Sequence, residues 1–182
     1  SEMCIRDRLH IMKLYAHHGF REFVLCLGYR GNMIKEHFLN YEAMNSDFTV
    51  ALGPKREIFH HGSLEEEGMT VTLADTGLES LTGKRVKAIQ KYIDDDTFIV
   101  TYGDGVSDVD ISELIAFHKT QGTKATLTAV QQPGRFGAFT LGSKDVKIST
   151  FQEKPMNGDS PWINGGFFVC EPSVIDLIKD DT

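Results

Sequence analysis

The spacing of apolar residues changes along this chain between a helical period and a strand period, and these changes predict its elements. Helical spacing predicts helices over residues 9–18, 32–41, 84–93, 110–121 and 172–179. Short runs rich in β-branched and aromatic residues predict strands over 22–27, 48–52, 57–60, 69–75, 97–101, 125–131, 137–141, 146–151 and 162–170. Because strands alternate with helices as far as Gly122, we expect an α/β fold with a mixed, mostly parallel central sheet and flanking helices.

Composition and charge exclude several classes of protein. The 182 residues carry 19 Lys and Arg against 26 Asp and Glu, and the formal net charge of −7 argues against nucleic acid as the main partner. No apolar run approaches the roughly 20 residues that span a bilayer, so we do not expect an integral membrane protein. The acidic balance is still compatible with a small anionic ligand, because glycine-lined backbone can hold phosphate locally.

The cysteines indicate a reducing compartment. Cys4, Cys26 and Cys170 are an odd number and lack metal-ligand spacing. Cys26 and Cys170 lie within apolar runs, which favours buried, reduced thiols and a cytoplasmic protein.

Both ends of the sequence suggest an internal fragment. Residues 1–8 show no clear period and resemble translated sequencing-adaptor sequence, so we expect a non-native leader there and a partial domain over 9–182. The sequence begins with Ser1 and stops at Thr182, directly after a predicted helix.

The sharpest candidate for chemistry is Asp104, which stands between Gly103 and Gly105 just after the predicted strand 97–101. In open α/β sheets, ligands bind beyond the carboxyl ends of the strands. Flanking glycines let the backbone approach a ligand, and a single carboxylate suits Mg²⁺, which combines one or two carboxylates with phosphate oxygens and water. A turn in which Asp and Gly only satisfy local geometry explains the pattern equally well.

Other polar groups stand at predicted strand ends or breaks. Lys154 follows a strand and precedes a proline, which suits a phosphate contact, although a surface lysine is the commoner outcome. Asn164 and Gly165 interrupt the strand 162–170, where either a sugar hydroxyl or a ligand-free bulge explains them. Gly137 lies in what reads more simply as a plain turn.

Asp108 and Asp110 offer a rival motif. Their spacing is that of a glycosyltransferase metal site, but their position at a predicted helix start favours helix capping.

Taken in order, seven motifs resemble the sugar-phosphate nucleotidyltransferase family over about residues 10–180. They are HIMKLY at 10–15, GYRG at 28–31, LADTG at 73–77, TGKR at 82–85, TYGDG at 101–105, PGRFG at 133–137 and WINGGFF at 162–168. The resemblance implies a Rossmann-like fold and transfer of a cytidylyl group from CTP to glucose 1-phosphate, giving CDP-glucose and pyrophosphate. It also implies Mg²⁺ as cofactor, a homo-oligomer and a role in surface-polysaccharide synthesis.

The resemblance implies roles for the residues that match the family's motifs. Asp104 would bind the metal and Lys154 would hold the phosphate of the sugar phosphate. The sugar contacts would come from Gly137, Glu153, Asn164 and Gly165. The nucleotide contacts would come from Thr76, Gly77, Thr82, Gly83, Arg85 and Gly103.

The sequence departs from the family pattern at both ends. The family's glycine-rich phosphate loop and the lysine of its Pro-Lys-Pro segment, expected just before His10, are absent, as is a second metal-binding Asp expected beyond Thr182. We therefore expect a missing first strand beside strands 22–27 and 97–101, and little or no catalysis by these residues alone. Two alternatives stay open: a glycosyltransferase that consumes a nucleotide sugar, and a non-catalytic domain that binds one.

Overall fold

The computed structural model describes residues 2–62, 66, 68–131, 138–141, 148–152 and 162–179. The helices are α1 (Glu2–His17), α2 (Gly31–Leu39), α3 (Tyr41–Asn45), α4 (Thr82–Ala88) and α5 (Ile111–Gln121), with 3-10 turns η1 (Gln90–Tyr92) and η2 (Pro172–Leu177). The strands are β1 (Glu22–Leu27), β2 (Asp47–Ala51), β3 (Glu57–His61), β4 (Thr70–Asp75), β5 (Phe98–Thr101), β6 (Ala125–Gln131), β7 (Ala138–Leu141), β8 (Ile148–Gln152) and β9 (Trp162–Cys170). β1, β6 and β9 have the predicted bounds, and the other strands differ from the prediction by one or two residues.

The strands form a mixed α/β arrangement, as predicted. β1 and β4 pair in parallel, with Leu25 opposite Leu73. β5, β9 and β6 form an antiparallel sheet with β9 in the middle. β2 pairs with β3, and β7 with β8, as separate antiparallel pairs. Among the described strands, β1 and β4 therefore pair in parallel, and the other pairs are antiparallel.

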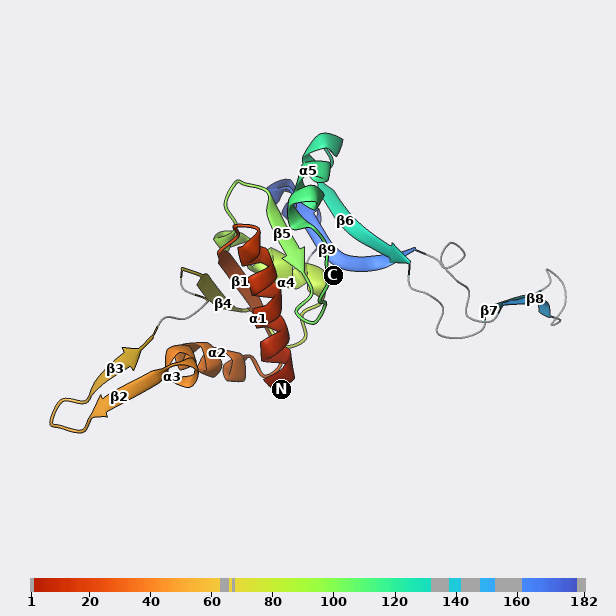
Figure 1. Cartoon of the computed structure of the whole chain (residues 1–182). Coiled ribbons are helices and arrows are strands. Elements are labelled where there is room, and N and C mark those ends of the chain that lie inside the picture. Colours follow the sequence, from red (N-terminus) through yellow and green to blue (C-terminus); the bar gives the residue numbers. More distant parts are fainter. Residues whose placement is uncertain are drawn as a thin grey trace.

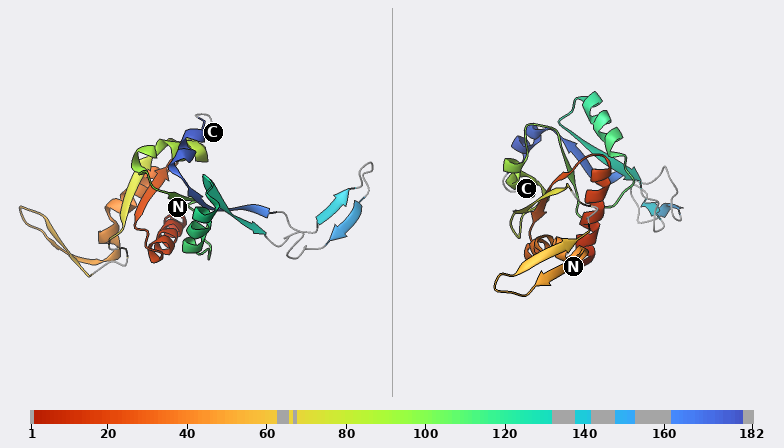
Figure 2. Two further views of the ribbon diagram at one scale, coloured as in Figure 1. Left: turned by 90° about the horizontal axis from the view of Figure 1, so that it is seen from above. Right: turned by 60° about the vertical axis from the view of Figure 1, so that its left-hand side comes forward.

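Helix α1 joins the two groups of strands. In Figure 1 it lies across β1, and the left view of Figure 2 shows it side by side with α5. The buried cluster consists of Ile11 and Tyr15 of α1, Ile111 of α5 and Phe167 of β9, with Phe23 of β1 and Ile99 of β5 packed against it. Each large apolar side chain buried in this way contributes about 1.5–3 kcal/mol. Contacts made by α1, more than strand pairing, thus hold β1 and β5 in one body.

An open side remains between β1 and β5. Within the described residues, β1 pairs only with β4, and β5 pairs only with β9. The buried hydroxyls of Tyr15 and Thr101 find no hydrogen-bond partner of standard geometry in the described part of the chain. Burial raises the pKa of Tyr15 to about 12, and the Thr101 hydroxyl opposes that rise. Unpaired strand edges and unsatisfied hydroxyls agree with the expectation of an incomplete sheet at this place.

A buried histidine ties α5 to β6 and to the residue that follows β9. His118 is 1% exposed; its Nδ1 lies 2.8 Å from the Thr126 hydroxyl and its Nε2 lies 2.9 Å from Oε1 of Glu171. The Thr97 hydroxyl donates to the same Glu171 oxygen at 2.9 Å. These hydrogen bonds, that from His118 first, hold the pKa of the Glu171 carboxyl below its usual range. The hydrophobic pattern of the sequence did not predict these hydrogen bonds.

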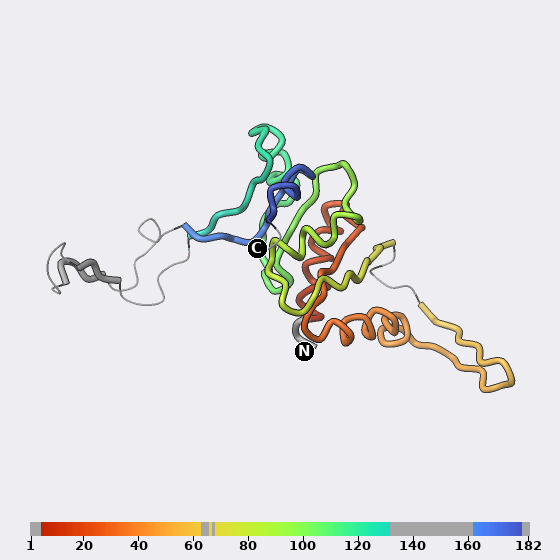
Figure 3. The backbone as a smooth tube through the Cα atoms, turned by 180° about the vertical axis from the view of Figure 1, so that it is seen from behind, coloured from red at the N-terminus to blue at the C-terminus, as the bar shows by residue number. Residues whose placement is uncertain are grey.

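The β2–β3 pair, which we call the arm (residues 47–61), projects from the body (Figures 1 and 3). Phe48, Leu52, Ile58 and Phe59 are exposed along it. A two-stranded ribbon is marginally stable by itself in water, and its exposed apolar side chains add no burial. The arm therefore lacks the packing that would hold an isolated hairpin firmly.

The helices depart from their predicted bounds more than the strands do. α1 begins at Glu2 because no Gly or Pro interrupts residues 2–17, so the stretch expected to be a leader continues the helix. The predicted helix 32–41 ends at Leu39, and the Asn40 amide donates to the Glu36 carbonyl at 2.8 Å as a second helix, α3, begins. Residues 172–177 form a 3-10 turn that starts at Pro172. None of the described helices combines the length and apolar character needed to cross a bilayer.

Candidate active site

The loop after β5 carries the candidate metal ligand in an exposed position. The Asp104 side chain is exposed, and Gly103 and Gly105 on either side are half-buried. A Cβ at Gly103 would lie 3.2 Å from Nε of Arg8, so glycine is the residue that fits beside this guanidinium without displacing it. Arg8, which belongs to the stretch expected to be a leader, therefore lies against the loop. The Asp104 carboxylate itself is open to a ligand.

The Asn164 side chain contacts this loop through Tyr102, a residue that sequence reasoning missed. Its Nδ2 donates to the Tyr102 hydroxyl at 3.1 Å, and its Oδ1 accepts from the backbone N–H of Gly166 at 2.8 Å. Tyr102 stands two residues before Asp104, so the end of β5 and the interior of β9 meet here. An aromatic residue at a strand end gives no sequence signal of such a partner.

A bulge in β9 directs Asn164 toward the loop. The pairing of β9 with β6 shifts its register between Leu127 and Ala129. Gly166 has φ +83°, and a Cβ at Gly165 would lie 2.8 Å from the Thr128 hydroxyl. A positive φ and this close approach both require glycine. The two glycines are therefore explained by the bulge, while a sugar contact by Asn164 stays a prediction.

Arg85 and Thr76 join the ends of β1 and β4 to the start of α4. The Thr76 hydroxyl is buried and donates to the Leu27 carbonyl at 2.9 Å. Nη1 of Arg85 donates to the Thr76 hydroxyl at 2.8 Å and to the same Leu27 carbonyl at 3.2 Å, and Nη2 donates to the Leu78 carbonyl at 3.2 Å. A Cβ at Gly28 would lie 2.7 Å from this guanidinium. The Thr76 hydroxyl and part of the Arg85 guanidinium thus bond to the protein's own chain, and contacts of these two residues with a nucleotide stay a prediction.

Cys26 belongs to the same cluster. Its thiol lies 3.8 Å from the Arg85 carbonyl, and burial raises its pKa against the opposing charge of Arg85. Cys170 is also a free thiol whose pKa is raised by burial and then by Glu171. In the described part of the chain, Cys26 and Cys170 are free thiols, as the sequence predicted, although Cys26 is half-buried and only Cys170 is fully buried.

The other nucleotide candidates line the turn between β4 and α4. Gly77 has φ +93°, and its N–H donates to the Asp75 carboxylate at 3.2 Å. The Ser80 hydroxyl closes the turn by donating to the Thr76 carbonyl at 2.6 Å. Thr82 is exposed and Gly83 is half-buried in the first turn of α4. The turn is therefore shaped by its own hydrogen bonds, with Thr82 facing outward.

Gly137, Glu153 and Lys154, three of the predicted substrate and catalytic residues, lie outside the described residues. Their predicted roles stay predictions. Asp104, Asn164 and Gly165 are the described members of the predicted metal and sugar sites, and the Tyr102 contact brings them into one region.

Asp110 of the rival Asp108–Asp110 motif is accounted for by capping. Asp110 is the N-cap of α5, and its Oδ1 accepts from the Glu113 N–H at 3.0 Å. The structure confirms the capping interpretation of this residue. Among the residues that the structure describes, no group of three His, Cys, Asp or Glu side chains converges on a point that could hold a metal ion.

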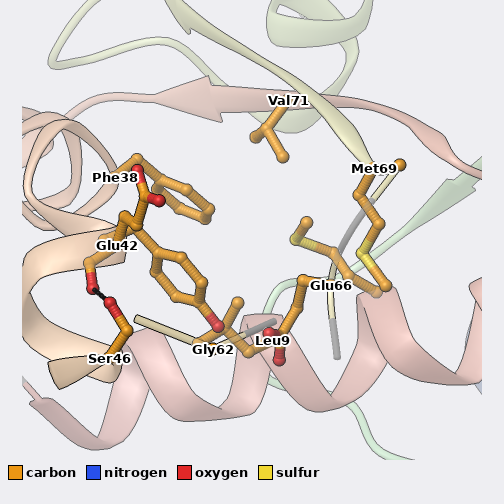
Figure 4. A pocket seen from close by; sticks show the side chains of 11 residues that line it. Leu9, Phe38, Glu42, Ser46, Gly62, Glu66, Met69 and Val71 are labelled. Atoms are coloured by element: carbon orange, nitrogen blue, oxygen red, sulfur yellow. Dashed lines mark hydrogen bonds between the residues drawn. The ribbon is translucent and has the colours of Figure 1, made fainter. Parts of the chain in front are cut away.

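A cavity of about 530 Å³ opens elsewhere, between α1, the α2–α3 segment and β4 (Figure 4). In Figure 4, Phe38 and Glu42 face it from one side, and Met69 and Val71 from another. Glu66 on its wall forms an ion pair with Lys13 at 2.8 Å. Burial raises the pKa of Glu66, but hydrogen bonds from Lys13 and Tyr41 outweigh it and leave the pKa lowered. The cavity contains none of the predicted site residues, and one of its two acidic side chains, Glu66, is already paired with Lys13.

The chain belongs to the nucleotidyl transferase family, which it matches over residues 8–182, and its α/β fold agrees with that family. It is 51% identical to the glucose-1-phosphate cytidylyltransferase of Salmonella typhimurium over 173 residues, which are 94% of this chain and 65% of the relative. A probable glucose-1-phosphate cytidylyltransferase of Bacillus subtilis is 39% identical over 172 residues, with the same coverage of 94% and 65%.

Solved structures support the fold. HddC from Yersinia pseudotuberculosis superposes with a TM-score of 0.58 at 19% identity, covering 96% of this chain and 67% of that one. The chain spans 65% of the length of the two curated cytidylyltransferase relatives.

Proposed function

We propose that this chain, within its full-length protein, transfers a cytidylyl group from CTP to glucose 1-phosphate, giving CDP-glucose and pyrophosphate. The observation that carries the proposal is the 51% identity to the Salmonella typhimurium glucose-1-phosphate cytidylyltransferase across 94% of the chain. The exposed Asp104 carboxylate and the Asn164 amide support it, since they place an anion and a neutral hydrogen-bonding group in one region.

Asp104 is the proposed ligand of a Mg²⁺ ion. A hard divalent cation binds carboxylate oxygen, and this carboxylate stands exposed on a glycine-flanked loop that a polyphosphate can approach. One protein carboxylate is enough when phosphate oxygens and water complete the coordination. When bound, the ion offsets the repulsion between phosphate oxygens.

The proposed chemistry demands little covalent help from the protein. An oxygen of the glucose 1-phosphate forms a bond to the α-phosphorus of CTP, and the bond from that phosphorus to the β-phosphate oxygen breaks as pyrophosphate leaves. Because a phosphate monoester is largely ionised near pH 7, no protein base has to remove a proton. The side chains position the two anions and stabilise charge.

The remaining roles follow the resemblance and stay proposals. Lys154 would hold the sugar phosphate, and Glu153, Gly137, Gly165 and Asn164 would contact the sugar. Gly77, Thr82, Gly83 and Gly103 would line the nucleotide. Thr76 and Arg85 would act on the nucleotide by holding the loop between β4 and α4 in place, since their polar atoms bond to the protein.

The test uses a completed chain, in which residues 9–182 replace the segment that they match in the Salmonella typhimurium relative. We expect pyrophosphate release that needs both CTP and glucose 1-phosphate, and little or none from the 182-residue chain alone. A glycosyltransferase would instead release free nucleotide from CDP-glucose. A non-catalytic domain would bind CDP-glucose without turnover, and either result would overturn the proposal.

We also propose that the full-length protein is a cytoplasmic homo-oligomer. The free thiols of Cys26 and Cys170 favour a reducing compartment. The arm exposes Phe48, Ile58 and Phe59 on a projecting ribbon, and such apolar surface is commonly covered by another subunit. Sedimentation of the completed chain should show an oligomer that the substitution Phe59→Asp weakens; a monomer of unchanged size would contradict this.

A further inference from the structure

Tyr102 links two candidate site elements that are far apart in the sequence. It directly follows β5 and precedes Gly103 and Asp104, and its ring lies on β9. A Cβ at Gly166 would lie 2.6 Å from Cδ2 of the ring. The ring also stands edge-on to Phe168, with 6.0 Å between the ring centroids. The position of the Tyr102 side chain is therefore set by β9 as well as by its own strand.

Hydrogen bonds on both sides of the Asn164 amide fix its orientation. The Gly166 N–H can only donate, so the amide oxygen must face it, which turns the NH₂ group toward the Tyr102 hydroxyl. One amide hydrogen and one acceptor lone pair are left, and the Asn164 side chain is exposed. The amide therefore presents a donor beside an acceptor, which is the pair that a sugar hydroxyl matches.

We propose that Tyr102 is a positioning residue: it ties the Asp104 loop to the Asn164 amide and so sets where the sugar lies relative to the metal-binding carboxylate. The identity of the sugar phosphate rests on the proposed function. The coupling itself rests on the 3.1 Å hydrogen bond and on the ring contact with Gly166.

The substitution Tyr102→Phe in the completed chain removes one hydroxyl and keeps the ring. A neutral hydrogen bond of this kind corresponds to roughly a 3- to 10-fold change in an equilibrium constant. We expect the KM for glucose 1-phosphate to rise by about that factor, with the KM for CTP unchanged and kcat altered less. Equal rises in both KM values would contradict the proposal, because they would indicate a general disturbance.

A double-substitution cycle separates coupling from independent effects. If Tyr102 acts through the amide, Tyr102→Phe should add little to the KM for glucose 1-phosphate once Asn164→Ala is present. Fold-changes that simply multiply would overturn the idea. Tyr92→Phe is the matched control, because this exposed ring lies in η1 beside the Lys91 amine and away from β9.

Hydrogen exchange tests the coupling without turnover. In the 182-residue chain, Asn164→Ala should speed the exchange of the amides of residues 103–105 by roughly threefold or more, although the substitution lies on another strand. Unchanged exchange would refute the coupling. If the unsubstituted completed chain releases no pyrophosphate, the proposed function fails, while the exchange result still decides the link between Tyr102 and Asn164.

Discussion

The loop between β4 and α4 and the loop after β5 differ in where their polar groups go. In the first, the Thr76 hydroxyl and the Arg85 guanidinium both donate to backbone carbonyls, and the guanidinium also donates to the Thr76 hydroxyl. In the second, the Asp104 carboxylate is exposed, and the Asn164 amide keeps one donor and one acceptor open. Both loops are proposed to contact ligands, but Thr76 and Arg85 of the first bond to the protein itself, whereas Asp104 and Asn164 of the second keep polar atoms open.

The difference shows that a charged side chain near a ligand loop can either hold the protein's own backbone or stay open to a ligand. The Arg85 guanidinium donates its hydrogen bonds to the protein's own chain, so removing this side chain is expected to lower the stability of the fold first. Asp104 makes no such contact with the described residues, so its loss is expected to act first on turnover. Substitutions whose effects on stability and on turnover are measured separately can therefore show whether the two loops differ in this way.

The largest expected effect is that of Asp104→Asn in the completed chain. Removing the proposed carboxylate ligand should lower kcat by about 100-fold or more, with the melting temperature nearly unchanged. Steady-state pyrophosphate release and thermal unfolding measure the two quantities. Asp108→Asn is the matched control, because Asp108 is exposed nearby and has no proposed role. Near-normal turnover with unchanged Mg²⁺ dependence would remove Asp104 from the site.

Arg85→Ala should have a smaller effect that appears mainly in stability. It leaves the buried Thr76 hydroxyl and the Leu27 carbonyl with fewer partners, which corresponds to about 1–3 kcal/mol of unfolding free energy. Urea denaturation of the 182-residue chain measures this. Lys84→Ala, on the exposed side of the same helix, should stay within about 0.5 kcal/mol. Equal stabilities of the two variants would show that the guanidinium does not hold the loop.

The smallest effect should be a change in the acid dependence of stability. Because hydrogen bonds lower the folded-state pKa of Glu171, its ionised form stabilises the folded protein above its ordinary pKa, and this stability is lost as pH falls through the lower folded value. In the Glu171→Gln variant, the unfolding free energy should therefore fall less steeply as the pH is lowered below about 4.5. His118→Gln removes the main partner and should have a similar effect. Parallel declines in all three proteins would contradict this reading.

The sequence predicted the elements that have a local hydrophobic period. It missed the features that depend on contacts between residues far apart in the chain. β1, β6 and β9 were predicted with correct bounds because their alternation or apolar run is a local signal. α1 was predicted too short, because residues 2–8 lack amphipathic spacing although they form helix. Helix α3 was missed, since five residues are too few for a period to show.

The candidate site divides in the same way. Asp104 and Asn164 were found because glycines at strand ends or inside strands are local signals. Tyr102 was missed because its partner lies 62 positions away, and the inward direction of Arg85 was missed because its acceptors lie on other elements. His118 shows the same limit, since its partners Thr126 and Glu171 come from β6 and the end of β9.

The cluster around α1 has a consequence for the order in which the molecule can be assembled. Ile11 and Phe167 stand near opposite ends of the chain, yet they belong to one buried group. Phe23, Ile99 and Ile111 can cover part of the α1 surface as they are synthesised, but the contact between Tyr15 and Phe167 forms only once β9 has been made. A nascent chain that stops before Phe167 should therefore leave part of this cluster uncovered and be more prone to aggregate than the longer chain.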